Sequence, residues 1–262
     1  MYVEEICRAG ATIEVSRYYT SRYNRPGVPR GPNRKKTKDE QQRINARRAE
    51  KKLRLLLNAN FVYGDHHMIL NYRRDARPPN REEMKKDADR FLRKLRAVYR
   101  KAGKELKYIH VMEVGARGGV HHHFVINHID SRTIQQCWDK GGINLYPLEQ
   151  SGQYRKLAGY LIKYSEQTLR REGALMGKRW HASRNLEQPT VEKHIIGRHS
   201  FKTNPSNRQG YYIDKDTVRG GTCDNTGYPY FTYTLIRFEK QTRIKLEERK
   251  SHARGKPIHR NG

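Results

Sequence analysis

Three side chains near the middle of the sequence are spaced so that they could bind one metal ion. Glu113 ends an apolar run, a glycine-rich segment (residues 115–119) follows, and His121 and His123 stand in the next apolar run. If the two runs pair as a hairpin centred on Arg117, Glu113 lies directly opposite His121, and His123 projects from the same face. The Cβ atoms of opposite residues are then ~5 Å apart, so a carboxylate and two imidazoles can converge.

Two imidazoles and a carboxylate leave several coordination positions open. Such a set suits Mg²⁺ or Mn²⁺ holding a phosphate, and it also resembles a catalytic zinc site with three protein ligands. The same alternation turns His122 toward the core and gives His110 the wrong parity for a ligand. The sequence neither supports nor excludes a fourth ligand from His66 or His67. A His-x-His pattern alone is more often a surface feature, so the register-matched carboxylate is what favours a metal site.

A second group of candidate reactive side chains follows about forty residues later, in the segment Tyr160-Leu-Ile-Lys163-Tyr164. On a helix the two tyrosines share one face, one turn apart. A free phenol has a pKa of about 10 and is a poor nucleophile, but a nearby cation and a metal-polarised phosphate can make it competent. With Leu157 the tyrosines also fit an ordinary core stripe, so they indicate catalysis only together with the histidines.

The charge of the chain predicts a polyanionic partner. Lys and Arg number 55 against 27 Asp and Glu, which gives a net charge of +28, and nucleic acid is the usual partner of such a surface. No apolar run approaches the roughly 18 residues that span a membrane. Three scattered cysteines without a CxxC pair favour a reducing cytoplasm. The candidate phosphate contacts are Arg22, Arg25, Arg30, Arg34, Lys35, Lys36, Arg117, Arg179, Arg184 and Arg198.

The order of the predicted elements indicates an α+β fold with antiparallel neighbours. The elements are an irregular basic arm (16–38), a helix behind a capping box at 37–40, strand-like runs in 61–72, a helix from Asn80 to Gly103, a hairpin (107–114 and 120–127), helices at 131–139 and 153–166, a basic loop (178–189), strands at 191–196, 210–214 and 229–238, and a charged helix from about 242. We expect three parts: a basic N-terminal arm and helix (1–60), a catalytic domain (61–240) and a basic tail (241–262).

These motifs resemble the HUH endonucleases, which initiate rolling-circle replication. His121-His122-His123 is similar to their paired histidines, although a histidine replaces the usual hydrophobic residue between them. Glu113 matches the carboxylate that commonly supplies their third ligand. The Tyr-x-x-Lys-Tyr segment at 160–164 looks like the two-tyrosine motif of bacteriophage initiators. Conjugative relaxases place their tyrosine before the histidines, so the order here favours replication initiators.

The resemblance implies a fold, an activity and partners. It implies an antiparallel sheet flanked by helices in a ferredoxin-like topology, with Glu113, His121 and His123 holding Mg²⁺ or Mn²⁺. Tyr160 or Tyr164, helped by Lys163, would nick single-stranded origin DNA through a 5′-phosphotyrosine intermediate and later rejoin strands.

The partners and the alternatives follow from the same resemblance. No phosphate-binding loop of the Gly-x4-Gly-Lys-Ser/Thr type is present, so we expect a separate helicase beside the polymerase, in the cytoplasm of a host of a phage or plasmid. The alternatives are a transposase or mobilisation relaxase of the same superfamily, a non-enzymatic nucleic-acid-binding protein, and a zinc hydrolase.

Overall fold

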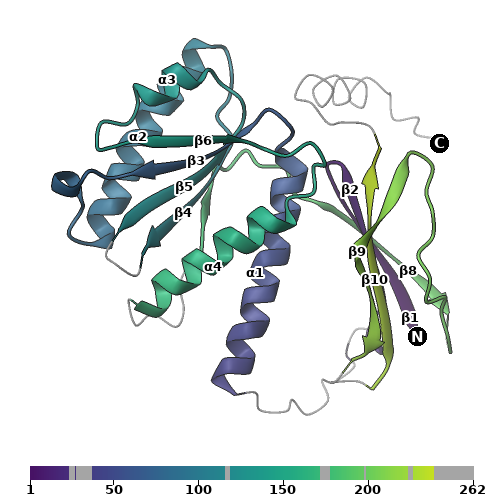
Figure 1. The fold of residues 1–262 in the computed structure, drawn as a ribbon. Coiled ribbons are helices and arrows are strands. Elements are labelled where there is room, and N and C mark those ends of the chain that lie inside the picture. Colours follow the sequence, from purple (N-terminus) through teal and green to yellow (C-terminus); the bar gives the residue numbers. More distant parts are fainter. Residues whose placement is uncertain are drawn as a thin grey trace. The chain divides into compact units, whose positions relative to one another are not determined.

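The computed structural model describes residues 1–23, 27, 37–115, 119–171, 178–197, 199–223 and 227–238. The chain forms two compact units. Unit 1 comprises Met1–Ala59, Ser151–Gln153 and Glu187–Lys240, and unit 2 comprises Asn60–Gln150, Tyr154–Leu186 and Gln241–Gly262. Each unit has a five-stranded antiparallel sheet in its described part (Figure 1). The predicted α+β class is confirmed. The units divide the chain differently from the predicted 61–240 domain, because residues 187–240 group with the N-terminal segment.

Unit 2 has the predicted ferredoxin-like topology. Its elements are β3 (His66–Asn71), the short 3₁₀ helix η1 (Arg74–Ala76), α2 (Arg81–Lys101), β4 (Tyr108–Val114), β5 (Val120–Ile126), α3 (Ser131–Gln135), β6 (Ile143–Pro147), α4 (Arg155–Arg171) and β7 (His181–Ala182). The strands lie in the order β6-β3-β5-β4-β7. The first four follow the βαββαβ pattern, with the first strand between the third and the fourth. Strand β5, with its three histidines, therefore lies at the centre of the sheet.

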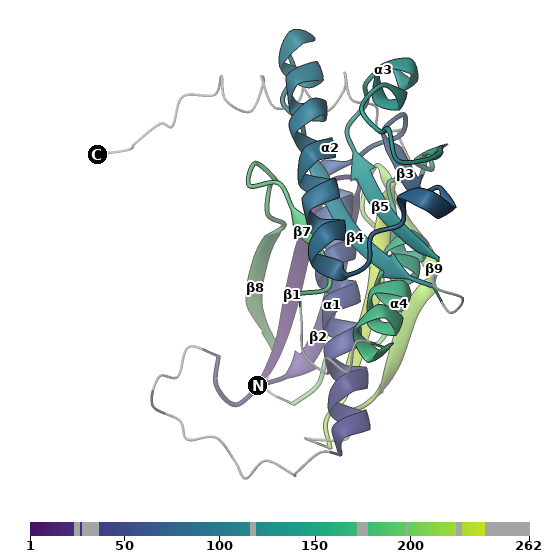
Figure 2. The same ribbon diagram turned by 90° about the vertical axis from the view of Figure 1, so that its left-hand side faces the viewer.

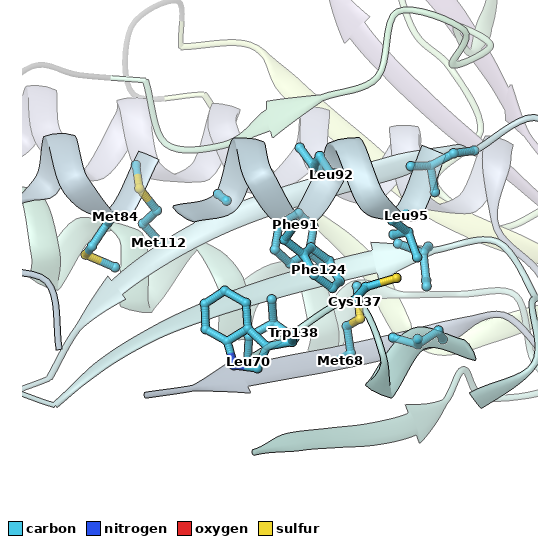
Figure 3. Close-up of a cluster of buried hydrophobic side chains, with 14 of the residues drawn as sticks. Met68, Leu70, Met84, Phe91, Leu92, Leu95, Met112, Phe124, Cys137 and Trp138 are labelled. Carbon is cyan, nitrogen blue, oxygen red and sulfur yellow. The ribbon is translucent and has the colours of Figure 1, made fainter. Parts of the chain in front are cut away.

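Helix α2 covers one face of this sheet (Figure 2). The side chain of Asn80 accepts a hydrogen bond from the Glu83 backbone N–H at 3.0 Å, as expected for an N-cap, and the helix ends before Gly103, which has a φ of +66°. Figure 3 shows the apolar stripe of α2 on the sheet, where Phe91 lies beside Phe124 of β5. Each large side chain buried there stabilises the fold by ~1.5–3 kcal/mol.

A chain of buried polar groups crosses this apolar layer. The Tyr72 hydroxyl donates to the Asp87 carboxylate at 3.2 Å and lies 2.7 Å from His122 Nε2. His122 Nδ1 in turn lies 3.0 Å from His110 Nε2. Because the carboxylate only accepts, the chain has one direction: His110 donates to His122, which donates to Tyr72. Each buried polar group thus has a partner, which removes most of the cost of burying it.

Unit 1 contains strands that the sequence analysis missed. Its elements are β1 (Tyr2–Ala9), β2 (Thr12–Tyr19), α1 (Lys38–Asn60), β8 (Thr190–Gly197), β9 (Tyr211–Thr222) and β10 (Pro229–Arg237), with the strand order β8-β1-β2-β10-β9. The predicted irregular arm from residue 16 is wrong at its start, since residues 16–19 belong to β2. Arg17, which reads as a loop residue, is nearly buried and pairs with Glu4 at 2.6 Å.

Two local features of unit 1 show how its elements are joined. Gly10 turns β1 into β2 with a φ of +57°, and a Cβ there would lie 1.8 Å from the Asn58 carbonyl oxygen, so only glycine fits. The predicted capping box of α1 is confirmed: the Thr37 hydroxyl accepts from the Glu40 N–H at 3.1 Å, and the Glu40 carboxylate accepts from the Thr37 N–H at 3.0 Å. The predicted helix from about 242 lies outside the described residues.

Acid should destabilise the fold through the buried His110. Burial, with His122 and other imidazoles nearby, lowers the pKa of His110 well below its usual 6.5. The unfolded chain therefore takes up this proton near pH 6.5, whereas the folded chain does so only at lower pH. The stability is fully present above pH ~6.5 and is lost as the pH falls toward the folded pKa, by about 1.4 kcal/mol per pH unit.

Urea unfolding of the wild type and His110→Asn between about pH 7 and pH 4 measures this term. The variant cannot take up the proton, so its stability should fall less steeply with acid. His194→Gln, at an exposed position of β8, should keep the wild-type slope. Equal slopes for the wild type and His110→Asn would contradict the assignment.

Candidate functional site

The hairpin pairs in the predicted register. Glu113 lies opposite His121, and Val111 lies opposite His123. On the other side of β5, strand β3 places Asn71 opposite His121 and Ile69 opposite His123. Since opposite residues share a face, Glu113, both predicted histidine ligands and Asn71 project from the same side of the sheet. The predicted orientation of His122 toward the core is also observed, because it belongs to the buried polar chain on the reverse face.

Glu113 and His123 are in direct contact. The Glu113 Oε2 atom lies 2.7 Å from His123 Nε2, and the exposed fractions of the two side chains are 12% and 1%. A hydrogen bond this short between a carboxylate and an imidazole in a water-poor site is stronger than an exposed one. Strands β4 and β5 therefore hold a carboxylate–imidazole pair on the outer face of the sheet.

His121 is oriented differently. Its Nδ1 lies 2.8 Å from the Asn71 Oδ1 atom, and its Nε2 would be 3.4 Å from a Cβ placed on Gly119. Burial lowers the pKa of His121 below its usual value, which favours the neutral imidazole that metals bind.

The three predicted metal ligands thus share a face, and their donor chemistry suits a divalent cation. However, within the ranges that the structure describes, no three His, Cys, Asp or Glu side chains are grouped closely enough to hold one ion. Glu113 and His123 meet each other, whereas His121 is bonded to Asn71. The metal assignment of Glu113, His121 and His123 stays a prediction.

His67, which the sequence left undecided as a ligand, lies beside this pair. Its Nε2 is 3.4 Å from His123 Nδ1, and the two rings stack at 5.6 Å. Burial and the neighbouring His123 lower the pKa of His67 to about 4, so it is neutral at physiological pH. The sequence gives no signal for this contact, because it depends on β3 pairing with β5 rather than with β4.

The two tyrosines of α4 lie over the histidines. The His123 ring is 5.4 Å from the Tyr160 ring and 6.0 Å from the Tyr164 ring, and the tyrosine rings are 4.6 Å apart. Tyr160 is 37% exposed, so an external group can reach it. Burial, followed by Tyr164 and Glu113, raises the pKa of Tyr160 to about 12. The Lys163 ammonium lies 5.9 Å from the centre of the Tyr164 ring.

The amphipathic face of α4 explains this placement. Ala158, Leu161 and Ile162 are buried, which leaves Tyr160 and Lys163 on the outer side of the helix. Thr168 then fixes the helix along the sheet: its hydroxyl accepts from the Val114 N–H at 2.9 Å and donates to the Tyr164 carbonyl at 3.0 Å. This hydroxyl connects the strand of Glu113 with the helix of the tyrosines.

The predicted phosphate contacts are only partly described. Arg22 and Arg184 are exposed. Arg179 forms an ion pair with Glu166 of α4 at 3.1 Å, so part of its charge is already compensated. The predicted contacts that lie outside the described residues are Arg25, Arg30, Arg34, Lys35, Lys36, Arg117 and Arg198. Across the described part of the chain, none of the helices combines the length and the apolar character needed to cross a bilayer.

Residues 66–169 match a family model whose description is that of a replication-associated protein of the ORF2 type. The matched segment starts at β3 and ends within α4, so it contains Glu113, the three histidines of β5 and both tyrosines. No curated protein and no solved structure matches the chain significantly. The family match confirms the resemblance to replication initiators for this segment, and it supports a role in DNA replication.

Removing the Thr168 hydroxyl should loosen the contact between α4 and β4. In Thr168→Val the Val114 N–H loses its acceptor, which costs about 1–3 kcal/mol of unfolding free energy. Thr168→Ser keeps the hydroxyl and loses only a methyl group, at a cost of about 0.8 kcal/mol. Urea unfolding of both variants measures the difference. Equal stabilities would mean that this hydrogen-bond pair does not hold the helix.

Proposed function

We propose that this protein initiates DNA replication by cutting one DNA strand with a tyrosine of α4 and later rejoining strands. The replication-associated family match supports the role. One observation of the site carries the reaction: Tyr160 and Tyr164, one helical turn apart, both lie against His123, which contacts Glu113. Nucleophile candidates and polar groups that can orient a phosphate thus share one face of the sheet.

The reaction is a transesterification. The phenolic oxygen of Tyr160 or Tyr164 attacks the scissile phosphorus, and the bond between phosphorus and the 3′-oxygen breaks. The phenolic proton passes to water, and the departing 3′-oxygen takes up a proton. The products are a 5′-phosphotyrosine and a free 3′-hydroxyl, which a polymerase can extend. Reversal by another 3′-hydroxyl rejoins a strand, so no external energy source is needed.

The tyrosines need activation. With a pKa raised to about 12, Tyr160 is a neutral phenol at physiological pH. Lys163 beside Tyr164 offers a positive charge to a phenolate or to the phosphate.

Glu113, His121 and His123 would hold a divalent cation, Mg²⁺ or Mn²⁺, if the Nε2 of His121 joined the Glu113–His123 pair. Such an ion supplies charge stabilisation at the phosphate oxygens.

Two tyrosines allow two consecutive cuts. Their rings are 4.6 Å apart, so both hydroxyls are carried by neighbouring turns of one helix. One tyrosine can hold the 5′ end during a round of replication while the second remains free to attack the regenerated junction. The net charge of +28 favours single-stranded and origin DNA as the substrate, and a separate helicase would open the duplex.

The test is a covalent adduct on labelled single-stranded origin-region DNA with Mn²⁺, identified by peptide mapping. We expect adducts on Tyr160 or Tyr164, a lower yield in each single Tyr→Phe variant, and none in the double variant. Tyr146→Phe is the matched control: Tyr146 is exposed and lies 6.0 Å from His67, and its loss should leave the adduct unchanged.

The other outcomes separate the alternatives. An adduct that persists in the double variant contradicts the tyrosine assignment. Binding that weakens steeply with salt but gives no adduct indicates a non-enzymatic nucleic-acid-binding protein. Cleavage without an adduct that survives both Tyr→Phe changes indicates a metal-dependent hydrolase. Loss of the adduct with EDTA and its return with Mn²⁺ tests the metal requirement.

A further inference from the structure

We propose that Asn71 is a positioning residue that fixes the tautomer and the orientation of His121. The hydrogen bond between Asn71 Oδ1 and His121 Nδ1 is 2.8 Å long. It would make His121 carry its proton on Nδ1 and keep the lone pair on Nε2. The use of that lone pair for a metal ion rests on the proposed function; the tautomer itself does not.

The chemistry of the pair gives this hydrogen bond one direction. The amide oxygen of Asn71 can only accept, so the imidazole nitrogen facing it must donate. Burial lowers the pKa of His121 below its usual value, so the ring is neutral near pH 7 and has a single N–H. That proton is used at Nδ1, and Nε2 is left as the acceptor or ligand atom. Ligating histidines commonly have such a partner on their second nitrogen.

Asn71 is itself held rigidly. Its backbone N–H donates to the Gly142 carbonyl at 2.9 Å, and its carbonyl accepts from the Trp138 indole N–H at 2.9 Å. The chain at Gly141 passes so close that a Cβ there would lie 2.1 Å from the Asn71 oxygen. The backbone that carries the amide is thus fixed from two sides. A rigid partner is what a positioning role requires.

The surroundings of His123 differ, which shows what is particular to His121. His123 Nε2 contacts a carboxylate, and its Nδ1 faces His67. An imidazole can donate or accept, so His67 is compatible with either tautomer of His123. An amide oxygen is compatible with only one tautomer of His121. Strand β3 therefore leaves one histidine adaptable and fixes the other.

Long-range ¹H–¹⁵N NMR of the metal-free protein near pH 7 reads the tautomer directly. We expect His121 in the Nδ1–H form in the wild type and in Asn71→Asp, which keeps an accepting oxygen. In Asn71→Leu, which removes the acceptor at similar volume, we expect a mixture of tautomers. A wild-type His121 in the Nε2–H form, or an unchanged tautomer in Asn71→Leu, would overturn the proposal. The other histidine signals report whether the fold is kept.

Mn²⁺ titration of the protein without DNA, followed by electron paramagnetic resonance, gives the second readout. Asn71→Leu should bind Mn²⁺ about 10–100-fold more weakly than the wild type, whereas Tyr146→Phe should bind it equally. Equal affinity of Asn71→Leu and the wild type would overturn the role of Asn71 toward a metal. If the wild type binds no Mn²⁺, the metal part of the proposed function fails, and the tautomer measurement still decides the role of Asn71.

Discussion

The pairing register between β4 and β5 is the constraint on which the site depends. Because side chains alternate along a strand, a shift of one residue would turn His121 and His123 into the apolar layer and His122 outward. The register is held from the core side, where Phe124 packs on Phe91 and His122 bonds to Tyr72. The reverse face of the sheet therefore specifies where the outer face presents its imidazoles.

The two faces of the sheet hold their polar groups in different ways. On the covered face every group of the Asp87–Tyr72–His122–His110 chain has a partner of its own, so the chain adds specificity without leaving a buried donor unpaired. On the outer face the contacts of Glu113 and His123 are with each other and with His67, all groups that can rearrange. A rigid layer thus supports an adaptable one, as a site that must admit a phosphate requires.

The sequence predicted the local features and missed the non-local ones. The hairpin register, the face of His122 and the caps at Thr37 and Asn80 depend on neighbouring residues, and they are observed as expected. Strands β1 and β2 were missed because their charged residues, such as Arg17, read as loop until the partner Glu4 is known. The roles of Asn71 and His67 also could not be predicted, since nothing local indicates that β3 lies next to β5.

The attachment of α4 has a consequence for a two-tyrosine reaction. Thr168 ties the carbonyl of Tyr164 to the backbone of Val114, so the helix cannot slide along β4 without breaking both hydrogen bonds. On the proposed function, exchange between Tyr160 and Tyr164 then requires rotation of the two side chains, or movement of the DNA end, over a distance comparable to the 4.6 Å between the rings. Side-chain rotation is fast, on the picosecond to nanosecond scale for exposed groups, so the helix can stay fixed while the nucleophiles alternate.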